Sequence, residues 1–142
     1  MIIIKLRDGQ GLGNQLWNYC SCRSIAEKLN LPFIVIDYKY FKGKEFLDIK
    51  SIIDNKEKEN TFKLPREHKI FNEALYYDQE YKHYSSDFDE RVLNISGCNL
   101  LNGLFQSEKY FFNDINKIKK YIKFKLEKVN ENSKAKNTCV LN

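Results

Sequence analysis

The first 37 residues constrain the fold most, because two short apolar runs flank an amphipathic stretch of helix length. Ile2–Leu6 is a β-branched run that ends at turn-forming residues, which is typical of a buried parallel strand. The stretch that starts at Leu12 and ends before Pro32 predicts a helix, and Phe33–Asp37 predicts a second strand. A strand, a helix and a strand in this order form a right-handed crossover unit. We therefore expect a parallel sheet and an α/β fold.

The helix prediction depends on apolar side chains that recur at steps of three and four residues. These side chains are Leu16, Tyr19, Cys22, Ile25, Ala26 and Leu29. Arg23, Glu27 and Lys28 fall outside this stripe, so we expect them on the outer face of the helix.

Three further segments have a legible pattern. Leu100–Phe105 predicts another apolar strand, and Glu45–Asn55 predicts a short helix. Residues 115–129 predict the clearest helix, because one apolar stripe is surrounded by lysines; the stripe contains Ile115, Ile118, Ile122, Leu126 and Val129. We interpret its basic flank as solvated surface, with binding to an acidic membrane as the alternative. Thr138–Leu141 predicts the start of one more strand.

The length and the charge limit the function classes. A chain of 142 residues with 42% hydrophobic residues can bury one core, so we expect one α/β domain or half of a larger protein. The formal charge of +5 is spread along the chain without a tight basic cluster, which argues against nucleic acid as a partner. No segment has the pattern of a signal peptide or a membrane span. We expect a cytoplasmic protein, with at most peripheral contact at the cytoplasmic face of the inner membrane.

The cysteines do not predict a metal site. Cys20 and Cys22 would lie about 200° apart on a helix, so they cannot share one metal ion. The four cysteines also lack a C-x-x-C pair, and we interpret them as small buried residues in a reducing compartment.

The glycine-rich loop between the first strand and the first helix is the strongest candidate for a binding function. No Lys-Ser/Thr pair follows Gly9, Gly11 and Gly13, which excludes a P-loop, and their spacing does not fit the dinucleotide fingerprint. Loop amides at a helix start can still face an anion, and the side-chain amides of Asn14 and Gln15 can bond sugar hydroxyls or phosphate. A helix-capping turn that binds nothing is an equal alternative.

A tyrosine-rich segment and the ionisable residues near it have less specific patterns. Tyr76, Tyr77, Tyr81 and Tyr84 could form a base- or sugar-stacking surface, but their irregular spacing favours core and rim aromatics. We assign no catalytic acid or base, since the local patterns favour structural or solvated roles for His68, His83, Asp87, Asp89 and Glu90.

Two segments resemble the motifs of one enzyme family. Gly11–Trp17, directly after the N-terminal apolar run, is similar to the G-G-L-G-N-Q-hydrophobic-aromatic opening of bacterial α-1,2-fucosyltransferases, glycosyltransferase family 11. Gly103–Phe111 is similar to that family's G-Y/F-F-Q-S-E-K-Y-F segment. The two motifs have the family's order and spacing, while residues 38–96 add little to the resemblance.

The resemblance implies a Rossmann-like parallel-sheet domain that is the N-terminal half of a GT-B-like two-domain glycosyltransferase. The implied reaction moves L-fucose from GDP-fucose to the 2-hydroxyl of a galactoside acceptor, with inversion and without a metal or other cofactor. Surface glycan such as the O-antigen of lipopolysaccharide is the implied destination. The implied substrate-binding residues are Gly11, Gly13, Asn14, Gln15, Gln106, Ser107 and Tyr110. For the last three, helix capping and strand-end packing are equally good interpretations.

The chain departs from the family pattern at two places. Gly9-Gln10-Gly11 stands where the family has two adjacent glycines, so the loop is longer. The family's H-x-R-R-G-D-like motif, whose arginine neutralises the donor pyrophosphate, would follow Thr138–Leu141, and the sequence ends at Asn142. We therefore expect residues 1–142 to be a fragment truncated before the donor-binding domain, inactive alone, that binds GDP-fucose only with the missing half. The alternatives are a non-catalytic α/β module that binds a glycan or a partner protein and, third, a nucleic-acid-binding protein.

Overall fold

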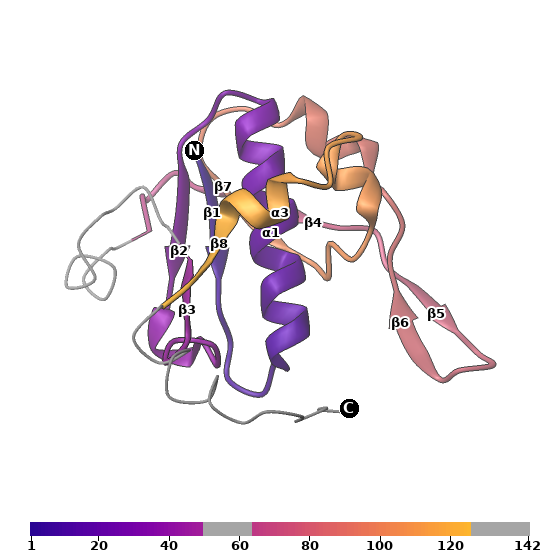
Figure 1. Ribbon diagram of the computed structural model, residues 1–142. Helices are drawn as coiled ribbons and strands as arrows, with labels where there is room; N and C mark the ends of the chain where they lie inside the picture. The colour runs from indigo at the N-terminus through magenta and orange to yellow at the C-terminus, as the bar shows by residue number, and fades with distance from the viewer. Residues whose placement is uncertain (50–63, 126–142) are drawn as a thin grey trace.

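The computed structural model describes residues 1–49 and 64–125, and its centre is a sheet of four parallel strands (Figure 1). In spatial order the strands are β2 (Phe33–Ile36), β1 (Ile2–Lys5), β7 (Asn99–Asn102) and β4 (Lys69–Asn72). Helix α1 (Leu12–Lys28) connects β1 to β2 and packs against one face of the sheet. The α/β class, the parallel sheet and the first strand–helix–strand unit are confirmed, and the arrangement is Rossmann-like.

Alternating side chains of the strands face two separate apolar clusters. Ile2 and Ile4 of β1 lie in the larger cluster with α1, whereas Ile3 lies in a smaller cluster on the opposite face. Residues Ile34 and Ile36 of β2 join Ile3 there. Because β1 and β2 are buried on both faces, their sequences are continuous apolar runs, as is usual for strands of a parallel sheet.

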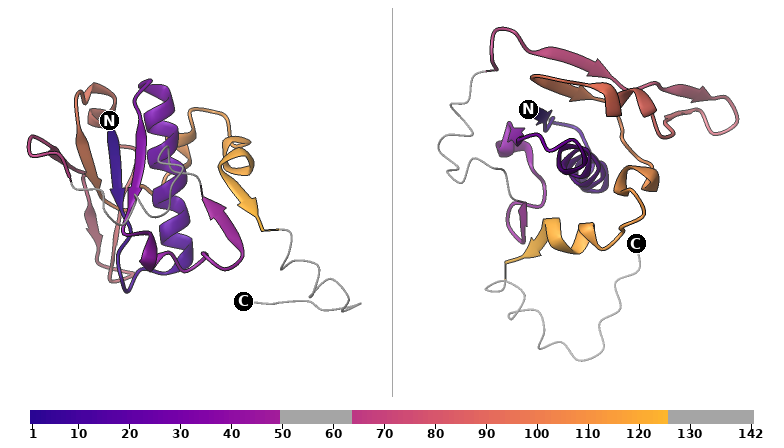
Figure 2. Two further views of the ribbon diagram at one scale, coloured as in Figure 1. Left: turned by 90° about the vertical axis from the view of Figure 1, so that its left-hand side faces the viewer. Right: turned by 90° about the horizontal axis from the view of Figure 1, so that it is seen from above.

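Helix α1 lies between the sheet and an outer layer (Figure 2). The outer layer consists of β3 (Leu47–Ile49), α3 (Lys117–Tyr121) and β8 (Ile122–Phe124). The middle of the predicted stripe of α1 is buried, and Leu16 and Leu29 at its ends are partly buried. Cys20 and polar residues on other faces of the helix are buried as well. Arg23 is partly buried, because its guanidinium lies 4.5 Å from the ring centre of Tyr121. Cys20 and Cys22 are buried as predicted, and burial raises the pKa of the Cys20 thiol to about 12. In the described part of the chain, no helix is both long and apolar enough to cross a membrane.

The structure of the outer layer differs from two helix predictions. Helix α3 (Lys117–Tyr121) has only five residues, and the chain continues as strand β8 (Ile122–Phe124), which pairs antiparallel with β3 (Leu47–Ile49). Of the long helix predicted over 115–129, Lys117–Tyr121 is helical, but the prediction is wrong for residues 122–125. Strand β3 replaces the helix predicted to begin at Glu45. Pairing between distant segments outweighs helical periodicity here, helped by the low helix propensity of β-branched isoleucines. Residues 50–55, 126–129 and the strand predicted over 138–141 lie outside the described residues.

A hairpin corrects the interpretation of the tyrosine-rich segment. Strands β5 (Tyr76–Asp78) and β6 (His83–Ser85) pair with each other and project from the body at the lower right of Figure 1. The side chains of Tyr76, Tyr77, Tyr81 and Tyr84 are 51% to 68% exposed. These rings are therefore neither core nor rim residues.

Paired substitutions on two neighbouring strands test the assignment of sheet faces. Leu101 of β7 is 3% exposed in the larger cluster, whereas Ile70 of β4 is 58% exposed on the opposite face. We expect Leu101→Ala to lower the free energy of unfolding by about 3 kcal/mol, because it removes buried methyl groups and leaves a cavity. Ile70→Ala should lower it by less than about 0.5 kcal/mol. Urea titrations measure both, and equal losses would contradict the assignment.

Candidate functional site

The candidate site lies at the carboxyl edge of the parallel sheet, where β1, β7 and β4 end. Strand β1 lies between β2 and β7. After β1 the chain crosses to β2 on one side, whereas β7 on the other side comes from a segment much later in the sequence. Such a position is a topological switch point, and open α/β sheets bind ligands outside the carboxyl ends of their strands there. The glycine-rich loop follows β1 at this edge, and the second motif follows β7.

A chain of polar side chains connects the three strand ends. Arg7 Nη2 donates a 2.7 Å hydrogen bond to Asn102 Oδ1, and Asn102 Nδ2 donates a 2.7 Å bond to Asn72 Oδ1. Arg7 and Asn72 are exposed, so this polar row faces solvent. None of these three residues was predicted from the sequence as part of the site. Arg7 could have been identified, since it is a cation directly after a predicted strand at the edge that binds ligands.

One face of α1 holds the two motif segments together. Gln106 Nε2 donates a 2.8 Å hydrogen bond to Asn14 Oδ1, which joins the second motif to the first. One turn further along, Asn18 Nδ2 donates to the Gly103 carbonyl at 3.0 Å, and the Ser21 hydroxyl donates to the carbonyl of Phe105 at 2.8 Å. Asn14, Asn18 and Ser21 share this face because they are four and three residues apart. Their polar spacing is the sequence signal for this shared face.

The glycines of the loop differ in what the fold demands of them. Gly9 has a positive φ of 83°, a conformation that favours glycine. Gly11 precedes the first residue of α1 and Gly13 lies in its first turn, and a Cβ at either position would meet nothing within 4 Å. The described fold therefore gives no steric reason for glycine at positions 11 and 13, and both lie exposed where a ligand could approach the backbone.

Gln15 and Tyr110 turn their polar groups into the protein. The Gln15 amide is fully buried, donates to the Tyr40 carbonyl at 2.8 Å and accepts from the Lys42 amide at 2.9 Å. Tyr110 is also fully buried, and burial raises the pKa of its hydroxyl. These two residues can position the edge but do not present polar atoms to a ligand. Ser107 precedes the short 3-10 helix Glu108–Phe111 without a side-chain capping bond, and its hydroxyl hydrogen-bonds the Asp87 carboxylate instead, so this predicted site residue is engaged within the protein.

A buried carboxylate fixes the loop after β7. Glu73 is 5% exposed, and its Oε2 accepts hydrogen bonds from the backbone amides of Leu104 and Phe105 at 2.7 and 2.8 Å. The Tyr110 hydroxyl donates to Glu73 Oε1 at 2.7 Å. The loop passes so close that a Cβ on Gly103 would lie 2.5 Å from the Cβ of Glu73. Glu73 thus sets the position of Gln106 at the edge.

A second carboxylate braces the same region. Asp89 accepts hydrogen bonds from Arg91 Nε at 2.9 Å and from the Ala74 amide at 3.0 Å, and its own amide donates to the Tyr110 hydroxyl at 3.0 Å. The hydrogen bonds from the Arg91 guanidinium are the main reason that the pKa of Asp89 falls to about 2. Asp89 therefore acts as a structural anion rather than a proton donor.

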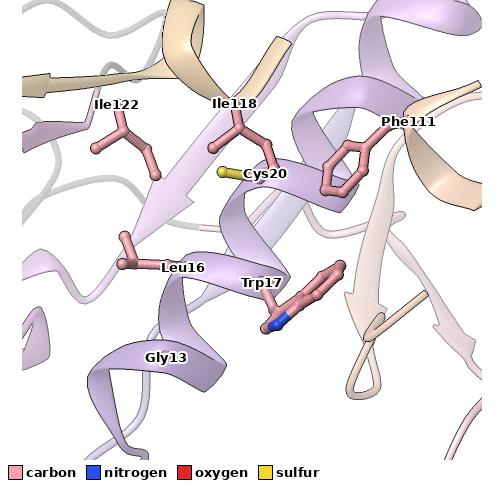
Figure 3. A pocket seen from close by; sticks show the side chains of 7 residues that line it. All are labelled: Gly13, Leu16, Trp17, Cys20, Phe111, Ile118 and Ile122. Carbon is pink, nitrogen blue, oxygen red and sulfur yellow. The ribbon is translucent and has the colours of Figure 1, made fainter. Parts of the chain in front are cut away.

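An apolar pocket of about 340 Å³ opens beside the edge, between α1 and the outer layer (Figure 3). The Trp17 side chain stacks on Phe111 with ring centres 5.7 Å apart and an angle of 25° between the planes. Gly13 lies at the helix-start end of this pocket, next to Asn14. The lining residues are Gly13, Leu16, Trp17, Cys20, Phe111, Ile118 and Ile122. An amide-rich edge and an aromatic pocket therefore lie side by side.

His68, Asp87 and Asp37 make local contacts within the fold. His68 Nδ1 lies 2.8 Å from the Pro65 carbonyl, and Asp87 forms an exposed ion pair with Lys109 at 3.1 Å. Asp37, which follows β2, pairs with Lys5 at 3.4 Å. Over residues 1–49 and 64–125, no group of three His, Cys, Asp or Glu side chains is placed to hold a metal ion.

Comparisons with known proteins give no further assignment. A scan against protein-family models, a search of curated proteins and a search of solved structures each found no match to this chain. The residues at the edge must therefore supply the argument for its chemistry.

Opposite effects of two alanine substitutions test the description of the loops. Gly103→Ala should lower the free energy of unfolding by about 2–3 kcal/mol, because the new methyl group collides with Glu73. Gly13→Ala should raise it by about 0.5–1 kcal/mol, since alanine favours the helix and meets no neighbour. Both changes are measured by urea titration with fluorescence of Trp17, the single tryptophan. A destabilising Gly13→Ala would show that the helix start needs glycine for the fold.

The low pKa of Asp89 predicts a pH-dependent contribution to stability. A carboxyl group whose pKa is lowered by folding stabilises the folded state above its ordinary pKa, and loses this effect as pH falls toward its folded pKa, about 2 here. Asp89→Asn should therefore destabilise the protein at pH 7, and its difference from the wild type should shrink between pH 4 and pH 2. Urea midpoints across this range measure it. The exposed Asp114→Asn is the control, and a pH-independent difference for Asp89→Asn would contradict the assignment.

Proposed function

We propose that this domain holds the galactoside acceptor of an α-1,2-fucosyltransferase at its carboxyl edge. The observation that supports this proposal is the Asn14–Gln106 hydrogen bond, because it joins the two fucosyltransferase-like motifs across 92 residues at the switch point of the sheet. A capping turn that binds nothing would not need a second motif beside it. The proposal includes a GT-B-like partner domain opposite this edge.

The chemistry of the edge suits a sugar better than a free phosphate. Within the described part of the chain, no hydrogen bond uses Asn14 Nδ2 or Gln106 Oε1, which leaves a donor and an acceptor together. Sugar hydroxyls need both kinds of partner at once, whereas a phosphate needs donors. The apolar face of a sugar ring can also pack on Trp17, which is 36% exposed and lies three residues after Asn14 on α1.

The transfer step places a separate demand on the donor side. Departing GDP carries developing negative charge, which cations or aligned amides must stabilise. The sequence contains no H-x-R-R-G-D-like motif, and Arg7 is the one arginine in the polar row at the edge. We therefore assign acceptor binding to residues 1–142 and expect no fucose transfer from them alone. The reaction needs no metal in this proposal.

Calorimetry and Trp17 fluorescence test the proposal by measuring the binding of methyl β-galactoside and lactose to residues 1–142. We expect saturable binding of both, with the C4 epimer methyl β-glucoside at least tenfold weaker. Asn14→Ala and Gln106→Ala should each weaken galactoside binding roughly two- to tenfold, the effect of one lost neutral hydrogen bond.

Asn94→Ala is the matched control, since it removes an exposed amide from the end of the 3-10 helix Glu90–Asn94. Binding that is unaffected by Asn14→Ala and Gln106→Ala would contradict the assigned site. Tight GDP-fucose binding without galactoside binding would contradict the assignment of the acceptor to this domain.

A further inference from the structure

The exposed tyrosines of the β5–β6 hairpin are a surface that the acceptor site does not explain. Four tyrosines on one short hairpin are each more than half exposed, and two of them, Tyr77 and Tyr84, lie together on one face. The hairpin projects from the body, and no other helix or strand lies alongside it in Figure 1 or in the view from above in Figure 2.

The hairpin presents its aromatic rings in a defined geometry. Tyr77 and Tyr84 are directly opposite in the antiparallel register, with ring centres 5.2 Å apart in an edge-to-face arrangement. The tip is closed by Asp78, whose Oδ1 accepts a hydrogen bond from the Tyr81 amide at 3.0 Å. The cross-strand pair therefore forms a preformed platform that needs little ordering to bind a ligand.

The hairpin follows the carboxyl edge directly along the chain. Strand β4 ends at Asn72, which belongs to the polar row with Arg7 and Asn102, and the chain enters the hairpin four residues later. Glu73 and Asp89 lie before and after the hairpin in the sequence. The Glu73 carboxylate accepts a hydrogen bond from the loop after β7, and the Asp89 carboxylate accepts one from the Ala74 amide. The base of the hairpin is thus held by the same carboxylates that position the loop carrying Gln106, which is the basis for extending a ligand from the edge toward the hairpin.

We propose that Tyr77 and Tyr84 form a distal subsite that stacks the inner sugars of a neutral oligosaccharide acceptor. This inference rests on the proposed function, because it assigns the end of the same glycan to Asn14 and Gln106. Pyranose rings have an apolar C–H face that packs on an aromatic ring and a rim of hydroxyls that bond polar groups. Tyrosine supplies both kinds of contact.

The composition of the hairpin favours a glycan over a protein partner. Residues 76–85 contain no aliphatic side chain, and Asp78, Glu80 and Lys82 give a formal charge of only −1. A stable protein interface buries about 800 Å² on each partner around an apolar centre, which is large for ten residues that stand apart from the body. A short stretch of sugar rings fits this surface, and its near-neutral charge favours a neutral chain.

The test compares ligand length in two proteins. Lactose and a neutral β-galactose-terminated hexasaccharide are titrated into the wild type and into Tyr77→Thr/Tyr84→Thr, in which threonine keeps the preference for strands. We expect the wild type to bind the hexasaccharide about tenfold more tightly than lactose. The variant should lose this tenfold advantage while its affinity for lactose stays within twofold of wild type.

Two further variants separate stacking from other causes. Tyr77→Phe/Tyr84→Phe keeps the rings and should retain most of the length-dependent gain. Tyr76→Thr removes a ring from the other face of the same strand and should leave both affinities unchanged. An unaltered urea midpoint shows that each variant keeps the body of the fold, to which the projecting tyrosines contribute little burial.

The outcomes distinguish this inference from the proposed function. Equal affinity of the wild type for lactose and the hexasaccharide overturns the distal subsite and leaves the acceptor site standing. Binding of neither sugar overturns the proposed function, and the inference falls with it. If hexasaccharide binding needs the two tyrosines but is unchanged when the terminal galactose is absent, this result supports the stacking surface and overturns the acceptor assignment. A wild-type dimer in sedimentation that Tyr77→Thr/Tyr84→Thr dissociates assigns the tyrosines to a protein interface and overturns the inference.

Discussion

The buried carboxylate of Glu73 is the interaction on which the geometry of the carboxyl edge depends. A carboxylate that is 5% exposed is costly unless its lone pairs are used, and here two backbone amides and one tyrosine hydroxyl use them. Those amides belong to Leu104 and Phe105, directly before Gln106. The chain therefore leaves β7 in one defined direction, and the second motif reaches Asn14 on α1 because of it.

The sequence predicts the fold best where the local pattern and tertiary burial agree. Strands β1 and β2 are buried on both faces and joined by a long helix, so their apolar runs and the helical period were sufficient. The prediction failed at Ile122–Phe124, where antiparallel pairing with Leu47–Ile49 decides the structure. Strand β4 was missed because one of its faces is exposed and its four residues carry little apolar periodicity. Local pattern cannot reveal a pairing partner that lies some 75 residues away.

The segments that form the candidate site could be predicted from the sequence, but the contacts between their side chains could not. The glycine-rich loop and the segment at residues 103–111 were identified from sequence, and both lie at the edge. Which amides face outward was not predictable, since Gln15 is buried under Tyr40 and Lys42 while neighbouring Asn14 is exposed. Arg7, Asn72 and Asn102 come together only because β1, β4 and β7 are adjacent in the sheet. Strand order is a long-range property that local sequence patterns do not determine.

The two proposed subsites share one mechanical support. Glu73 holds the loop that carries Gln106, and Asp89 holds Ala74 and Arg91 beside the base of the hairpin, while the Tyr110 hydroxyl bridges the two residues. A ligand that contacts both Gln106 and the hairpin would meet two surfaces whose separation is fixed by this buried network. Binding then costs little conformational entropy, because the rings and the amides are already in place. The same network makes the edge sensitive to acid, since the bonds that Asp89 accepts weaken as its carboxylate is protonated.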